Sequence, residues 1–230
     1  MNSLVVIPAR GGSKGIPRKN IKPLNGKPLI EYTIDVARQI VPDSNICVST
    51  DDPEIISVVE KYRLKVPFIR PDYLSNDTAG TYEVLLHALD FYEKRGNVYD
   101  NIILLQVTSP FRKVEHVKEA MTLYHNGIDM VVSVKQVTAN PYYNCFEEDE
   151  NGFLHVSKGD GHLVCRQDVP KVWEYNGAVY IINSRSLKQT PMSNFQRRIK
   201  YEMDDIYSVD LDTMFDWKIA ELMLKEKMVE

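Results

Sequence analysis

The chain has 230 residues, of which 43% are hydrophobic and 26% are charged, and its formal net charge is −4. This length and apolar content fit one α/β domain with a substantial core. A weakly negative chain gives no electrostatic case for a nucleic acid or an acidic membrane as partner, and we expect neither. Three scattered cysteines, no secretory signal pattern and no membrane-length apolar run favour a cytoplasmic protein.

The first predicted element is a buried strand that leads directly into a cationic, glycine-rich loop. Residues 4–7 are aliphatic and mostly β-branched, as in a strand covered on both faces. The N-terminal loop that follows (residues 9–20) carries three glycines and four cations. Backbone amides and cations at a strand end suit a polyphosphate, but the loop matches neither the P-loop nor the dinucleotide fingerprint. At this point a surface loop with solvated charges is the alternative.

Strands and helices then alternate along the chain, which implies βαβ units and a mostly parallel sheet. Ligands of such sheets bind beyond the carboxyl ends of the strands. The polar turns near Arg10, Arg70 and Gln106 are therefore expected to converge on one crevice. The pattern predicts strands at 46–50, 66–70, 102–106, 130–134, 178–182 and around Val209, and helices at 29–40, 54–62, 81–94, 114–124 and 214–228.

Residues 135–175 interrupt this alternation with an aromatic, asparagine-rich and weakly periodic segment. Turn-rich stretches surround one short hairpin strand, predicted at 153–156. We interpret the segment as an insertion that projects from the sheet. Its aromatic residues suit a partner subunit, and a lid is the alternative.

Two carboxylates, Asp210 and Asp212, alternate just before the last predicted helix. On an extended backbone they point to the same side, and their oxygens suit Mg²⁺. A helix-capping role is equally compatible with Asp212. Arg166 could hold a carboxylate with two hydrogen bonds or form a surface ion pair, and Tyr180 could belong to the core. The histidines show no metal spacing, and no nucleophilic triad is apparent.

Taken together, these motifs resemble those of the acylneuraminate cytidylyltransferases, including relatives that activate legionaminic or pseudaminic acid. The resemblance implies one Rossmann-like domain over residues 1–230, of the nucleotide-diphospho-sugar transferase type, with 135–175 as a projecting dimerisation insertion. It covers nearly the whole chain in the expected order. The matching stretches are 7–15, 19–20, 49–51, 70–71, 104–110, 166–167, 176–180 and 210–212.

The resemblance also implies a reaction, in which CMP passes from CTP to the anomeric hydroxyl of a sialic-acid-like nonulosonic acid and pyrophosphate leaves. It implies Mg²⁺ on Asp210 and Asp212, a homodimer, and catalytic roles for Arg10, Lys19 and Asp212. The implied sugar site consists of Gln106, Arg166, Asn176 and Tyr180. The implied CTP site consists of Ala9, Arg10, Gly11, Gly12, Ser13, Lys14, Gly15, Lys19, Asn20, Arg70 and Thr81.

One departure concerns Glu174, which stands where several sialic-acid relatives carry a cation. A carboxylate there would repel the carboxylate of the sugar if it faced the site, so the identity of the sugar stays open. A cytidylyltransferase for the eight-carbon sugar acid Kdo and a non-catalytic nucleotide-sugar binding protein are the alternative hypotheses.

Overall fold

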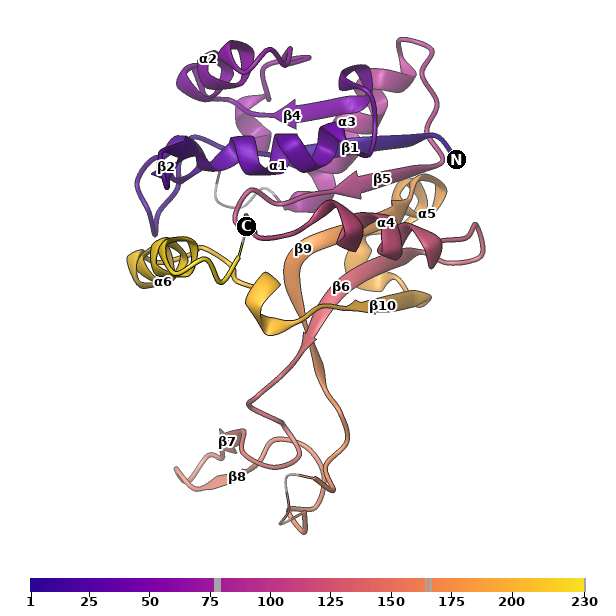
Figure 1. The fold of residues 1–230 in the computed structure, drawn as a ribbon. Helices are drawn as coiled ribbons and strands as arrows, with labels where there is room; N and C mark the ends of the chain where they lie inside the picture. The colour runs from indigo at the N-terminus through magenta and orange to yellow at the C-terminus, as the bar shows by residue number, and fades with distance from the viewer. Residues whose placement is uncertain (77–79, 164, 166, 230) are drawn as a thin grey trace.

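A six-stranded sheet in the order β10-β6-β9-β5-β1-β4 forms the centre of the molecule (Figure 1). The computed structural model describes residues 1–76, 80–163, 165 and 167–229. β1 (Ser3–Pro8) pairs in parallel with β4 (Ile46–Ser49) and β5 (Asn101–Leu104). β10 (Arg198–Glu202) pairs in parallel with β6 (Met130–Gln136). Because β9 (Trp173–Asn183) runs antiparallel to both β5 and β6, the predicted mostly parallel sheet is confirmed with one reversed strand between two parallel halves.

Helices cover both faces of this sheet. The alternation of side chains along β1 divides the core, since Val5 and Ile7 face one layer while Leu4 and Val6 face the other. None of the helices described is long and apolar enough to cross a membrane. The layer against Val5 contains α1 (Leu29–Arg38), α2 (Pro53–Lys61), α4 (Val114–Thr122) and α6 (Met214–Lys225), and the layer against Leu4 contains α3 (Thr81–Glu93) and α5 (Ser184–Gln189).

Two of the predicted strands do not form. Residues 66–70 contribute only an isolated parallel bridge between Thr50 and Ile69, because Pro67 brings no backbone donor to a ladder. Val209 lies outside the strands, in a connection where the Leu211 amide bonds instead to the Thr108 carbonyl at 2.9 Å. The sheet ends in β10 on one edge and in β4 on the other. The two apolar residues of β10 alternate with charged ones, as expected for a half-covered strand.

The start of α2 shows how the sequence fixes a connection beside the N-terminal loop. Pro53 occupies the first helical turn, where its missing N–H costs nothing. The Asp52 carboxylate caps the helix by accepting from the amides of Glu54 at 2.8 Å and Ile55 at 3.1 Å. The acidic helix start predicted from the sequence is confirmed.

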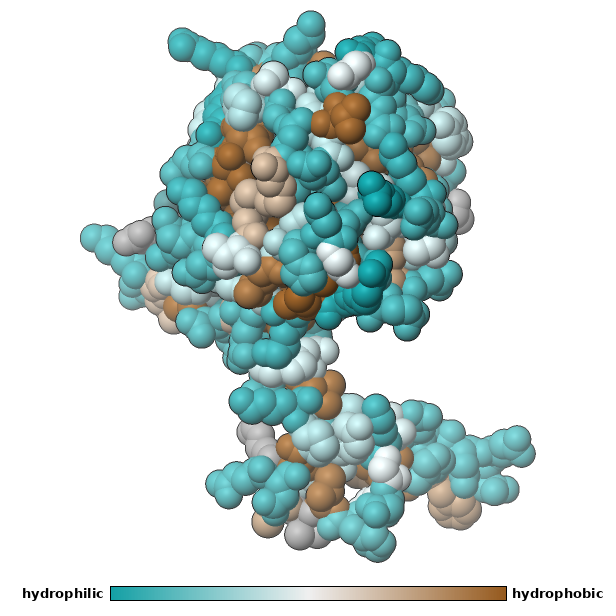
Figure 2. Space-filling model, turned by 90° about the vertical axis from the view of Figure 1, so that its right-hand side faces the viewer, coloured by the Kyte–Doolittle hydropathy of each residue, from teal (hydrophilic) through white to brown (hydrophobic). Residues whose placement is uncertain are grey.

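The chain between β6 and β9, residues 137–172, extends away from the body as an arm (Figures 1 and 2). Its regular structure is a hairpin of β7 (Phe146–Glu148) and β8 (Leu154–Val156), which agrees with the predicted strand at 153–156. Trp173 stands at the root of the arm, with the Lys200 ammonium 4.0 Å from its ring centre. Figure 2 shows apolar surface on the arm, and its exposed large apolar residues are Tyr143, Phe146, Phe153 and Leu154.

Candidate active site

A crevice of about 460 Å³ opens beyond the carboxyl ends of β1 and β5. The turns near Arg10, Arg70 and Gln106 all line it, so their predicted convergence is confirmed. Ala9, Gly11 and Gly12 of the N-terminal loop do not line it. The predicted site residues that do are Arg10, Ser13, Lys14, Gly15, Lys19, Asn20, Arg70, Thr81, Gln106 and Asp212.

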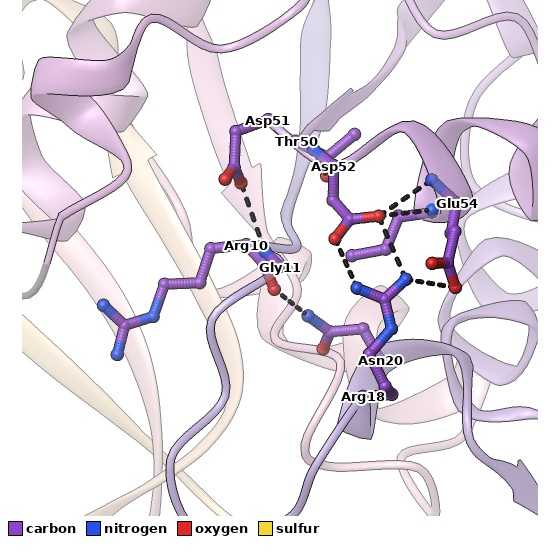
Figure 3. A network of polar contacts seen from close by, with 9 residues as sticks. Arg10, Gly11, Arg18, Asn20, Thr50, Asp51, Asp52 and Glu54 are labelled. Atoms are coloured by element: carbon purple, nitrogen blue, oxygen red, sulfur yellow. Dashed lines mark hydrogen bonds and ion pairs between the residues drawn. The ribbon is translucent and has the colours of Figure 1, made fainter.

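The back of the N-terminal loop is attached to the acidic residues that follow β4 (Figure 3). The Gly11 amide donates to Asp51 at 3.1 Å. The Arg18 guanidinium holds Asp52 through two bonds of 2.5 and 3.1 Å and reaches Glu54 at 2.6 Å. Arg18 thus pairs with two carboxylates behind the loop, and it is absent from the crevice lining.

The front of the loop is tied to the C-terminal carboxylates. Lys19 donates from Nζ to the Leu211 carbonyl at 2.6 Å and pairs with Asp212 at 3.0 Å. A Cβ on Gly15 would lie 2.0 Å from the Asp212 carbonyl oxygen, so only glycine permits this approach. The cap of α6 is made by Thr213 and Asp216, which removes the capping alternative for Asp212. The Asp212 side chain is 72% exposed and projects beside the loop.

Asp210 faces a neighbouring space, the acidic cavity of about 410 Å³, which it shares with Glu174 and Asp216. Desolvation raises the pKa of the Asp210 carboxyl, a hydrogen bond from Thr108 lowers it, and the charge of Asp212 raises it. The two carboxylates therefore repel each other across Leu211, and a divalent cation between them would relieve this cost. Within the described ranges, no group of three or more His, Cys, Asp or Glu could hold a metal ion. The structure does not bring the predicted pair into one cavity, since Asp212 lines the crevice and Asp210 lines the acidic cavity. Their carboxylate oxygens are of the ligand type that Mg²⁺ takes, and a substrate phosphate commonly completes its ligands.

Two buried arginines hold the backbone beside the crevice through hydrogen bonds. Arg70 donates through Nε to the Ser49 hydroxyl at 3.0 Å and through a terminal nitrogen to the Ser49 carbonyl, and desolvation lowers its pKa. Arg112 was not identified from the sequence as a site residue. It donates to the carbonyls of Gln106 at 3.0 Å and Ala178 at 2.7 Å, and burial lowers its pKa to about 9. A single arginine in a turn gave no signal of this bracing role.

The predicted sugar residues that the structure describes fall in two places. Gln106 lines both the crevice and an adjoining side cavity of about 290 Å³, which Tyr180 also lines. Burial raises the pKa of the Tyr180 hydroxyl to about 12. Asn176 is buried, and its amide accepts from Ser133 at 2.6 Å and donates to Ser208 at 2.9 Å. Arg166 lies outside the described residues.

Asn176 also lines the acidic cavity that Asp210 and Glu174 share. It sits where the pairing of β6 and β9 shifts register between Val132 and Val134. Its bond to Ser208 anchors the start of the segment that carries Asp210. Glu174, the departure noted in the sequence, forms an ion pair with Lys135 at 3.0 Å, so this lysine offsets the charge of its carboxylate.

The sequence model of the family described as Cytidylyltransferase matches residues 4–227. The chain belongs to this family. This cytidylyltransferase is 32% identical over 228 residues to the CMP-N,N'-diacetyllegionaminic acid synthase of Legionella pneumophila, covering 98% of this chain and 97% of that protein. It is 36% identical over 220 residues to the N-acylneuraminate cytidylyltransferase of Streptococcus agalactiae, covering 94% of this chain and 52% of that protein.

A solved structure agrees in fold. The CMP-2-keto-3-deoxy-manno-octonic acid synthetase complexed with CTP superposes with a TM-score of 0.72, covering 99% of this chain and 100% of that one. At 17% identity this likeness bears on the fold alone, and it confirms the expected Rossmann-like architecture. The family resemblance inferred from the motifs is likewise confirmed, and the chain is a nucleotidyltransferase enzyme.

Proposed function

We propose that the protein transfers CMP from CTP to the anomeric hydroxyl of a sialic-acid-like nonulosonic acid and releases pyrophosphate. The observation that carries this proposal is the contact of Lys19 with Asp212, two residues that are 193 positions apart. It places a cationic, glycine-rich loop against a carboxylate in one crevice of a cytidylyltransferase. The relatives named above act on legionaminic and neuraminic acids, and both are nonulosonic acids.

In this proposal the N-terminal loop holds the triphosphate of CTP. Arg10, Lys14 and Lys19 line the crevice and offer charge-assisted hydrogen bonds to phosphate oxygens. Lys19 contacts Asp212, and in this proposal its ammonium stabilises the negative charge that develops as pyrophosphate leaves. Asn20 fixes the loop by donating to the Arg10 carbonyl at 2.9 Å, while Arg70 and Thr81 lie on the wall assigned to cytidine.

Asp210 and Asp212 would hold Mg²⁺ together with the triphosphate. The bound ion would neutralise charge on the phosphates as the bond between the α- and β-phosphate breaks. Before that, Asp212 keeps the Lys19 ammonium oriented toward the crevice. The sugar hydroxyl approaches the α-phosphorus from the side of Gln106 and Tyr180, where the side cavity adjoins the crevice.

The test is a pyrophosphate-release assay with purified protein, CTP, Mg²⁺ and a panel of neuraminic, legionaminic, pseudaminic and Kdo acids. Release is expected only when CTP, metal and one of the three nonulosonic acids are present together. Turnover with Kdo alone would instead support the Kdo-type alternative. Tight CTP binding without turnover on the whole panel would support the non-catalytic alternative.

A second test addresses the metal site. Asp212→Asn keeps the size of the side chain but removes the charge that would bind Mg²⁺, and this side chain is 72% exposed. The expected result is a loss of pyrophosphate release with an unfolding midpoint close to that of the wild type. Near-normal turnover would remove Asp212 from the metal site.

We further propose that the enzyme is a homodimer joined through the arm. A hairpin of two three-residue strands is too small to be stable alone, and Phe146, Phe153 and Leu154 are more than half exposed on it. A second copy would cover them. Light scattering is expected to give twice the chain mass for the wild type and the chain mass for Leu154→Asp. A monomeric wild type would contradict the proposal.

A further inference from the structure

Arg18 stands between the two halves of the candidate site. Its guanidinium points backward, where it holds Asp52 with two bonds and Glu54 with a third (Figure 3). Its backbone begins the 3₁₀ turn η1 (Lys19–Ile21), which carries Lys19 to the crevice. The side chain that is anchored and the side chain that faces the ligand are therefore adjacent in the chain.

The backbone at Arg18 is held in an unfavourable form. Its φ of 56° lies in the left-handed region, which residues other than glycine seldom occupy unless their surroundings fix them. The Arg18 carbonyl accepts from the amides of Ile21 at 3.1 Å and Lys22 at 3.0 Å, so this conformation sets the start of η1. A change at Arg18 would redirect Lys19.

The other end of the N-terminal loop is attached to the same acidic segment, residues 51–54. The Gly11 amide donates to Asp51, and a Cβ on Gly11 would lie 2.3 Å from an Asp52 carboxylate oxygen. Asp52 is itself fixed, since it caps α2. Its side chain is 12% exposed, whereas Glu54 is 74% exposed, so Asp52 is the principal anchor. The hydrogen bonds from Arg18 are the largest cause that lowers the pKa of Asp52, so both partners stay charged.

We propose that Arg18 is a positioning residue, whose clamp on Asp52 fixes the N-terminal loop in the form that presents Lys19 to the phosphates of the nucleotide. This inference rests on the proposed function for the identity of the ligand. The clamp itself rests on contacts that exist without any ligand. Arg18 acts through Lys19 and touches no substrate.

Four variants separate positioning from general stability. Arg18→Gln removes the clamp, and Asp52→Asn removes its charge while an asparagine keeps the helix cap. The double variant tests whether the two act together, and Arg18→Lys keeps the charge without the two-bond geometry. The matched control is Arg38→Gln. Arg38 holds Asp43 with two bonds of 3.0 Å on the far side of the molecule, where α1 leads into β4.

Steady-state kinetics with CTP give the first readout. Arg18→Gln is expected to lower kcat/KM by about 10- to 100-fold, the cost of a reactive group displaced by about 1 Å. Arg18→Lys should retain part of the activity. The kcat/KM of the double variant should be no more than about twofold below that of Arg18→Gln, because the first substitution already removes the interaction that the second would remove. Arg38→Gln should lower the unfolding midpoint and leave kcat/KM within about twofold of the wild type.

Amide hydrogen exchange gives a second readout that needs no substrate. Arg18→Gln should speed exchange in residues 10–22 and leave α2 protected, because Asp52 still caps that helix. If the wild type transfers no CMP, the proposed function fails and this exchange pattern alone decides the clamp. Unchanged exchange in residues 10–22, kinetic losses that multiply in the double variant, or an equal loss in Arg38→Gln would each overturn the inference.

Discussion

Replacing Gly15 with alanine tests the approach of the N-terminal loop to the segment that carries the two aspartates. The added Cβ would lie 2.0 Å from the Asp212 carbonyl oxygen, and ordinary contact begins at 3.4 Å. One of the two segments must therefore move by about 1.4 Å. The backbone of Gly15 is outside the left-handed region, so the methyl group is the whole perturbation.

Such a displacement separates Lys19 from Leu211 and Asp212, which it now contacts at 2.6 and 3.0 Å. We expect kcat/KM for CTP to fall by about 100-fold, the cost of misplacing a catalytic group by about 1 Å. Overpacking costs about 1–3 kcal/mol, which for a chain of this size lowers the unfolding midpoint by about 2–12 °C. Pyrophosphate release and thermal unfolding of the same preparation measure the two effects.

Gly12 provides the comparison within the same loop, because a Cβ there would meet nothing within 4 Å. Gly12→Ala adds the same methyl group and is expected to retain at least about ten times the activity of Gly15→Ala. The reasoning is refuted if Gly15→Ala keeps kcat/KM within about threefold of the wild type. It is also refuted if both alanine variants lose activity equally.

Two further substitutions test charges at the candidate site, and a third tests an ion pair away from it. Lys19→Met should lower kcat by about 100- to 1000-fold, as measured by pyrophosphate release at saturating CTP. Asp210→Asn should abolish most activity yet raise the unfolding midpoint at pH 8. Because folding raises the pKa of the Asp210 carboxyl, its ionisation destabilises the folded protein as the pH rises through that pKa, and asparagine avoids this cost. Asp129→Asn should lower the free energy of unfolding near pH 7, and the loss should shrink when urea unfolding is measured at increasingly acid pH. Hydrogen bonds from Arg197 lower the pKa of Asp129, so protonation of the wild-type carboxylate removes the benefit of its charge.

Local patterns were enough to place most of the sheet. The aliphatic runs at β1, β4, β5, β6 and β9 are buried on both faces, and this is the signal that a parallel α/β sheet leaves in a sequence. The edge strand β10 is covered on one side only, so its five residues resemble an exposed loop. The strand predicted around Val209 was wrong, because an apolar residue between polar ones also occurs in an irregular connection. Here the backbone of that connection bonds outside the sheet, through the Leu211 amide and the Thr108 carbonyl.

The candidate site shows a similar division. The crevice residues cluster in stretches whose residue types indicate phosphate and metal chemistry, so their convergence could be predicted. The residues that hold these stretches in place could not. Arg18 has the same charge as the cations beside it, and only the structure shows that Asp52 takes up that charge. Arg112 and Asn176 bond to groups that lie far away in the sequence.

The positions of the two tryptophans allow the arm to be followed by intrinsic fluorescence. Trp217 is 1% exposed inside the body, whereas Trp173 is partly exposed at the root of the arm. Their emission should therefore separate into a blue component that soluble quenchers barely reach and a redder component that they reach easily. Bending or covering of the arm would alter the second component and leave the first as an internal standard, so movements of the arm can be followed in real time without a label.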